Sequence, residues 1–142
     1  MNIQTTRFGD IEVDKNRTIH FPEGVLGFPE HKDYTLLEHK PGSPFIWLQS
    51  TTAPELAFII TNPFLIKHDF LENITQDEKS FFIDKNGDEL IIYAIVSIPR
   101  GEAEKMTVNL MGPLIINTES KTGKQVILAN SGYNHQHSMR PD

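Results

Sequence analysis

The six histidines are the first residues that could do chemistry, because imidazole binds metals and transfers protons near neutral pH. The chain has no cysteine, so a zinc site would have to be built from histidines and carboxylates. His135 and His137 could share one face of a strand, but they lie in a polar tail without an evident third ligand. A solvated pair is the better interpretation, and we expect no metal site.

Two short patterns resemble ion-binding loops without completing them. Residues 84–89 begin like a calcium loop, but the sixth position is Glu89 instead of glycine and the twelfth is Ile95 instead of glutamate. Gly24 and Gly27 lack the Lys-Ser/Thr that completes a phosphate-binding loop. We therefore predict turns at both places, no cofactor and no catalytic residue.

Short apolar runs must form the framework of the molecule. The 142 residues correspond to one domain. Runs rich in Ile, Val, Phe, Thr and Tyr alternate with Gly, Pro, Asn and Asp, a pattern typical of short strands. They predict a mainly all-β fold, a small antiparallel β-barrel or sandwich of about nine or ten short strands with one short helix. We place the domain at residues 1–130, followed by a loose polar tail over 131–142.

Turn chemistry predicts how these strands are joined. Thr75 with Glu78 three residues later predicts a capping box and a short helix over 76–81. Residues 86–87, an Asn-Gly pair, predict a type I′ hairpin. A second hairpin is expected where residues 121–124 lead into a strand over 125–129.

The loop over residues 22–29 is expected to present Val25, Leu26 and Phe28, because two prolines and two glycines exclude regular structure there. An aromatic side chain on such a loop can anchor a protein interface. The alternative is that Phe28 folds back onto the end of the barrel. Both interpretations of Phe28 remain open at this point.

Charge and hydropathy narrow the class of partner. The net charge is −6, from 19 acidic and 13 basic residues without a basic stripe, so we expect no direct nucleic-acid binding. No apolar run approaches the roughly 20 residues of a spanning helix, and the first residues lack a secretory signal, so we expect a cytoplasmic protein without a membrane partner. The acidity serves solubility or attracts a basic protein.

Several blocks of the sequence closely resemble the FliW family of flagellar assembly factors. They run nearly the length of the chain and are found at residues 21–28, 45–50, 58–63, 106–117 and 123–128. Two departures from the usual pattern are Asn62 for aspartate and Gly112 for alanine, and Gln136 replaces a basic residue of the tail.

This resemblance implies a partner switch and no enzyme. Proteins of the family bind the RNA-binding repressor CsrA, relieve its block on flagellin translation, and also bind flagellin itself. Two mutually exclusive complexes suffice for such a switch. The alternative, from another class, is an uncharacterised β-barrel enzyme or small-ligand-binding domain, which a deep pocket with convergent titratable groups would favour.

Acidic residues beside apolar ones suggest where a basic partner binds. We expect the partner-binding surface to include one continuous segment, two acids of the helix and the aromatic residue of the loop. The candidates are Asp69, Phe70, Leu71, Glu72, Asp77, Glu78 and Phe28.

Overall fold

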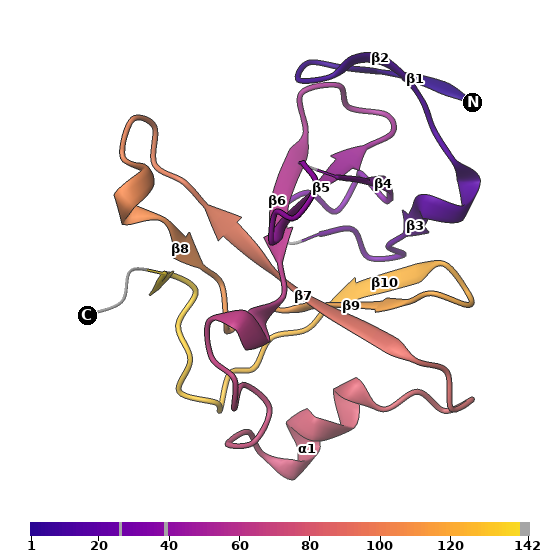
Figure 1. Ribbon diagram of the computed structural model, residues 1–142. Helices are drawn as coiled ribbons and strands as arrows, with labels where there is room; N and C mark the ends of the chain where they lie inside the picture. The colour runs from indigo at the N-terminus through magenta and orange to yellow at the C-terminus, as the bar shows by residue number, and fades with distance from the viewer. Residues whose placement is uncertain (26, 39, 140–142) are drawn as a thin grey trace.

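A closed β-barrel forms the centre of the computed structural model, which describes residues 1–25, 27–38 and 40–139 (Figure 1). Five strands pair with their sequence neighbours in antiparallel order, and a later hairpin bridges the two ends of this series. The hairpin closes the ring because one of its strands pairs with β7 and the other with β3, in parallel. The seven barrel strands are β3 (Thr18–His20), β4 (Asp33–Glu38), β5 (Phe45–Ser50), β6 (Ala57–Thr61), β7 (Leu90–Ser97), β9 (Leu114–Asn117) and β10 (Thr122–Gln125).

Smaller elements decorate this barrel. An N-terminal hairpin forms a separate two-stranded sheet, and two short strands extend the sheet beyond β7. These strands are β1 (Asn2–Thr5), β2 (Gly9–Glu12), β8 (Thr107–Val108) and β11 (His137–Ser138). The helical elements are α1 (Gln76–Lys79) and four 3-10 turns, η1 (Lys15–Arg17), η2 (Pro63–Leu65), η3 (Ser80–Phe82) and η4 (Ala103–Lys105). The predicted mainly all-β barrel with one short α-helix is confirmed.

Two apolar clusters hold the molecule together. The first fills the barrel and includes Phe21, Tyr34 and Leu48. The second lies against the outer face of the sheet and includes Phe70 and Leu110. Strand β7 is apolar along nearly its whole length because alternate residues enter the two clusters, and both of its faces are covered.

The expected helix start is confirmed. The hydroxyl of Thr75 accepts a hydrogen bond from the backbone N–H of Glu78, and the Glu78 carboxylate accepts one from the N–H of Thr75. The helix continues past Lys79 as the 3-10 turn η3, so the helical segment ends one residue beyond the predicted limit.

The type I′ hairpin expected at residues 86–87 is wrong. Helical turn η3, rather than a strand, precedes it, and Asn86 does not adopt the positive φ that a type I′ turn requires at its first central position. Instead the Asp84 carboxylate accepts hydrogen bonds from the N–H groups of Asn86 and Asp88. Of the two residues 86 and 87, only Gly87 has positive φ, at 77°.

The last hairpin lies earlier in the chain than predicted. Asn117 pairs with Thr122, and the turn between them places Lys121 at φ 58°. The second strand of the hairpin is therefore residues 122–125 instead of 125–129. Strand β8 is limited to Thr107–Val108, because Lys105 ends the 3-10 turn η4.

The described part of the tail is docked, which corrects the expectation of a loose segment. The Tyr133 ring stacks on Phe70 with 5.2 Å between ring centroids, and its hydroxyl donates a hydrogen bond to the Phe70 carbonyl. Farther along, His137 pairs with Val108 in the ladder between β11 and β8. The polar composition of the tail did not predict this docking. Two backbone pairs with β8 and one aromatic contact hold the segment, and neither requires an apolar composition.

Two buried side-chain oxygen atoms have no hydrogen-bond partner among the described residues, the hydroxyl of Tyr34 and the amide oxygen of Gln49. The Tyr34 side chain is fully buried, and its hydroxyl makes no hydrogen bond within the described residues. An unpaired buried hydroxyl costs roughly 1–3 kcal/mol. We therefore expect Tyr34→Phe to leave the free energy of unfolding unchanged or to raise it by about 1 kcal/mol. Urea denaturation at neutral pH measures the change, and a loss of more than about 1 kcal/mol would mean that the hydroxyl is hydrogen-bonded.

The same hydroxyl gives the protein a response to alkali. Burial raises the pKa of Tyr34 from its ordinary value of 10.0 to about 12. The unfolded chain then releases this proton above pH 10 while the folded chain retains it, so stability falls as pH rises from 10 through 12. Tyr34→Phe should lose less stability than the wild type between neutral pH and pH 11, which parallel urea titrations at the two pH values would detect.

Candidate functional site

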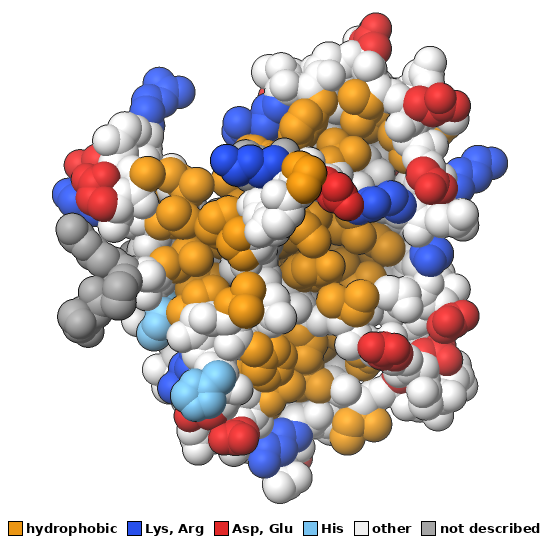
Figure 2. Space-filling model, viewed as in Figure 1, with side chains coloured by type: hydrophobic (Ala, Val, Ile, Leu, Met, Phe, Trp, Pro, Cys, Tyr) orange, Lys and Arg blue, Asp and Glu red, His pale blue; other side chains and the backbone are white. Residues whose placement is uncertain are grey.

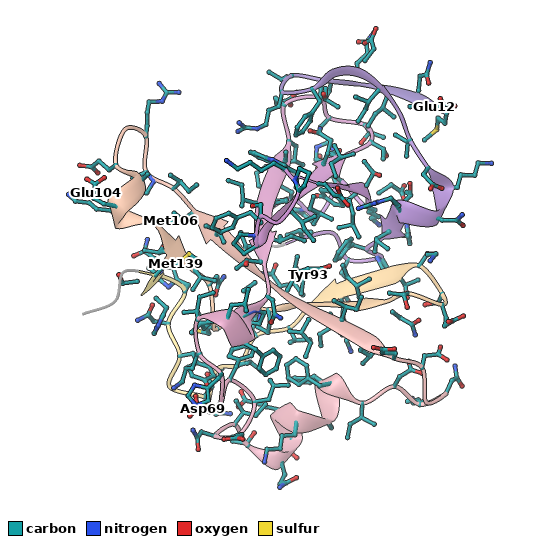
Figure 3. The ribbon with its side chains drawn as sticks, in the orientation of Figure 1. Glu12, Asp69, Tyr93, Glu104, Met106 and Met139 are labelled. Carbon is teal, nitrogen blue, oxygen red and sulfur yellow. The ribbon has the colours of Figure 1, made fainter. Side chains whose placement is uncertain are left out.

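Of the predicted acids, Asp69 and Glu72 lie in the segment between η2 and α1, whereas Asp77 and Glu78 belong to α1. Asp69 lies at the end of the molecule opposite Glu12 (Figure 3). Asp69 pairs with Lys67, with 3.0 Å between the carboxylate and the ammonium. This hydrogen bond and charge lower the pKa of Asp69 and raise the pKa of Lys67. Glu72 and Asp77 are exposed to solvent. Asp69, Glu72 and Asp77 are called the acidic segment below.

Phe70 is a core residue, which corrects its expected place on the surface. Its side chain is fully buried, stacked under Tyr133 and 5.8 Å from the Phe64 ring in an edge-to-face contact. Leu71 is half-buried and packs against the same cluster. The apolar pair Phe70 and Leu71 between two acids resembled an exposed anchor, but the side chain of Phe70 is directed into the core.

Glu78 is also unavailable to a partner. Only 4% of this residue is exposed, and its carboxylate joins two distant parts of the chain. One carboxylate oxygen accepts the N–H of Thr75 and the other accepts the N–H of Asn130, at 3.1 Å. The capping box explains the first contact, whereas the contact to Asn130 depends on tertiary structure that sequence does not show.

Phe28 combines features of both interpretations. Its ring lies edge-to-face on Phe58 of the barrel, with 5.7 Å between centroids, yet 41% of the residue is exposed. The loop is held by a hydrogen bond from the N–H of Phe28 to the carbonyl of Val25, at 2.7 Å. Leu26, expected beside it, lies outside the described residues.

Phe28→Ala is expected to yield a folded protein that is less stable by about 1–2 kcal/mol, because a fully buried phenylalanine would cost about 3–5 kcal/mol. Thermal unfolding would measure the loss, and circular dichroism would verify the fold. If the variant does not fold, Phe28 belongs to the core. A folded variant that no longer binds a partner would make it an interface anchor.

A groove of about 400 Å³ between η3 and the β9–β10 hairpin is the candidate small-molecule site. Exposed Phe81 and Ile83 form part of its wall. The amide of Asn117 donates to the carboxylates of Asp84 and Asp88, both at 3.2 Å. Asp84 is thus occupied in holding a turn, so the groove does not present a free pair of carboxylates for acid–base chemistry.

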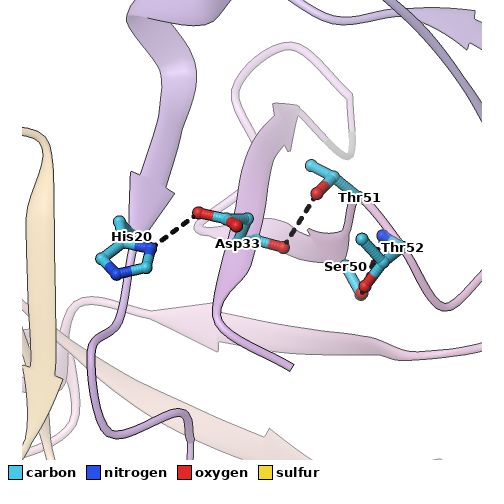
Figure 4. Close-up of polar contacts among 5 residues, drawn as sticks. All are labelled: His20, Asp33, Ser50, Thr51 and Thr52. Carbon is cyan, nitrogen blue, oxygen red and sulfur yellow. Dashed lines mark hydrogen bonds and ion pairs between the residues drawn. The ribbon is translucent and has the colours of Figure 1, made fainter. Parts of the chain in front are cut away.

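His20 and Asp33 form a histidine–carboxylate pair that the sequence did not suggest. Their side chains meet across strands β3 and β4, with 2.8 Å between Nδ1 and the carboxylate, and both are about half exposed (Figure 4). The nearby Ser50 hydroxyl instead accepts the N–H groups of Thr52 and Ala53 in a turn. The three side chains therefore do not form a nucleophile–base–acid series. Only the register of the two strands could have revealed the pair.

Within the described residues, no group of three histidine, aspartate or glutamate side chains is arranged to hold a metal ion. In the same part of the chain, no helix is both long and apolar enough to cross a membrane. The closed sheet defines the class of the fold, which is a small β-barrel.

Comparison with known proteins gives the family. The chain belongs to the FliW family, whose sequence profile, described as FliW protein, matches residues 2–139. A flagellar assembly factor FliW from Magnetococcus marinus is 36% identical over 142 residues, covering 100% of this chain and 86% of that protein. The one from Alkaliphilus metalliredigens is 39% identical over 138 residues, covering 96% of this chain and 85% of the relative.

A solved structure agrees with this assignment. The crystal structure of a flagellar assembly factor FliW superposes with a TM-score of 0.82 at 31% sequence identity. The match covers 100% of this chain and 99% of that one. The overall fold is thus shared with a solved member of the family.

Proposed function

We propose that this protein is a flagellar assembly factor that acts by binding other proteins in the cytoplasm. The full-length relationship to proteins named flagellar assembly factor FliW carries this proposal. The absence of free, converging catalytic side chains around the described groove supports a role in binding.

The two partners proposed are CsrA and flagellin. Binding to CsrA would relieve its repression of flagellin translation, and binding to free flagellin would release CsrA to repress again. The switch requires only that the two complexes exclude each other, so the protein needs no catalytic residue. The rigid barrel is suited to this task, because a pre-formed surface loses little conformational entropy on binding.

The acidic segment is the proposed contact for CsrA, a basic protein. Glu72 and Asp77 are exposed, and among the described residues neither forms an ion pair within the chain. Their charge is therefore available to attract a basic partner, and the overall charge of −6 adds to the attraction. Asp69 contributes less because Lys67 neutralises it.

Reversing the two free charges should weaken the complex. We expect Glu72→Lys/Asp77→Lys to bind CsrA about tenfold more weakly and with a smaller dependence on salt. Complementary charges at an interface raise the affinity, and salt screens this contribution. Titration calorimetry at two salt concentrations would measure both effects.

The matched control is Asp10→Lys/Glu12→Lys, which changes the net charge equally on exposed β2, and Glu12 lies far from Asp69 (Figure 3). The control should bind within about twofold of the wild type. Equal losses in the two variants would show that total charge, rather than the acidic segment, governs the affinity.

A further inference from the structure

A row of apolar side chains crosses the outer face of the barrel. Leu37 of β4 lies opposite Trp47 of β5, Trp47 opposite Ile59 of β6, and Ile59 opposite Val96 of β7. Residues directly opposite each other in antiparallel strands point to the same face of the sheet. Leu37, Trp47, Ile59 and Val96 are called the outer row below.

The outer row runs beyond the second core. Val96 belongs to that core and Ile59 packs against it, whereas Trp47 and Leu37 continue the row toward the N-terminal hairpin. Leu37, Trp47 and Ile59 are all only half-buried. The segment that joins β7 to β8 and carries η4 is called the arm below. Figure 2 shows apolar side chains gathered over this face of the molecule between the barrel and the arm.

Methionines extend the same surface toward the arm. Met106 and Met139 are half-buried, pack against the second core and lie beside the sheet (Figure 3). Methionine side chains adapt their shape and are frequent at surfaces that bind apolar partners.

The cation Arg7 lies over Trp47, in the outer row. The guanidinium of Arg7 lies 4.7 Å from the centroid of the Trp47 ring, and Phe8 packs edge-to-face on the same ring. Among the described residues, no carboxylate forms an ion pair with Arg7. Glu104 points away from the sheet on the far side of the arm (Figure 3). Arg7 thus places one positive charge directly over Trp47, on a protein whose net charge is −6.

Backbone pairing determines what kind of segment could bind here. Strands β5 and β6 are each paired on both sides, so their backbone groups are not free to bond an added strand. A partner segment must therefore bind through its side chains. Its own backbone N–H and C=O groups must already be hydrogen-bonded within the segment, as they are in a helix. Neighbouring strands lie about 4.8 Å apart, close to the roughly 5–6 Å between side chains three or four apart on a helix.

We propose that the outer row is a docking surface for an amphipathic helix of a partner protein, with an acidic residue of that helix bound by Arg7. The apolar face of the helix lies across β4 to β6, over half-buried Leu37, Trp47 and Ile59, and its carboxylate forms an ion pair with the Arg7 guanidinium. This surface is separate from the acidic segment, which favours a basic partner, and the inference does not depend on the identity of either partner in the proposed function.

Trp47 is the sole tryptophan of the chain, so its fluorescence reports on the outer row directly. The probes are two capped helical peptides of about 15 residues, with leucines along one face and either glutamates or lysines flanking them. We expect the glutamate peptide to shift Trp47 emission to the blue and protect it from acrylamide. It should bind about three- to fivefold tighter than the lysine peptide.

Two variants make the test specific. Arg7→Glu, on an exposed residue, should reverse the preference between the peptides, whereas Lys85→Glu, the same charge change in the turn before β7, should leave it intact. Failure of the glutamate peptide to protect Trp47, or an unchanged preference in Arg7→Glu, would overturn the proposal. If Trp47 becomes protected from acrylamide as the protein concentration rises without peptide, and sedimentation detects dimers, the outer row binds a second copy of the chain and the proposal is wrong.

Discussion

Gly24→Ala is expected to destabilise the protein by about 2–5 kcal/mol, a large part of the roughly 5–15 kcal/mol that stabilises a typical domain. Gly24 has φ +71°, which costs a residue with a Cβ about 1–2 kcal/mol. An added Cβ would also lie 2.6 Å from the Phe28 carbonyl oxygen and 2.6 Å from Cα of Pro29. Both atoms belong to the backbone, so no change of rotamer relieves the clash.

The matched control for this variant is Gly27→Ala in the same loop. Gly27 has φ +90°, but nothing lies within 4 Å of the position of its Cβ. This control should therefore lose only the conformational contribution, about 1–2 kcal/mol. Urea denaturation of both variants measures the difference, and equal losses would refute the close approach of residues 28–29 to Gly24.

Glu78→Ala should cost about 2–4 kcal/mol, because a buried carboxylate bonded to two backbone N–H groups is removed. The N–H of Thr75 loses its capping partner, and the N–H of Asn130 loses the contact that ties α1 to the segment after β10. Glu78→Gln retains an oxygen acceptor for one of the two bonds and should lose about half as much.

The control for Glu78 is its neighbour Asp77, which is exposed and lies in the same turn of helix. Asp77→Ala should change stability by about 0.5 kcal/mol or less. In thermal unfolding, Glu78→Ala should lose the most stability, Glu78→Gln less, and Asp77→Ala the least. A loss in Asp77→Ala equal to that in Glu78→Ala would mean that helix-end charge, rather than the buried contacts, is what matters.

Local chemistry in the sequence was enough to predict the strands and the helix start. The short apolar runs typical of strands include residues 45–50 and 90–98, which contain β5 and β7, and Thr75 with Glu78 predicted the capping box. These predictions succeed because residue type and backbone conformation are directly linked in strands and caps. The loop rich in glycine and proline also has the irregular conformation expected of it, with Gly24 at positive φ.

Long-range contacts account for what the sequence did not predict. Phe70 and Glu78 both appeared suited to a surface, yet one stacks under Tyr133 and the other bonds to Asn130. The outer row is likewise invisible in the sequence, because Leu37, Trp47 and Ile59 meet only through strand register. The sequence gives the type of each residue directly. The face of the fold that the residue occupies depends on how distant segments pair.

The partner exchange proposed for this protein is tested most directly by a competition experiment. The wild-type chain is mixed with purified CsrA, the complex is isolated by size-exclusion chromatography, and flagellin monomers are then added in increasing amounts. We predict that CsrA co-elutes with the chain and is released in proportion to the flagellin bound. A chain that binds neither protein, or a stable complex containing all three, would contradict the account.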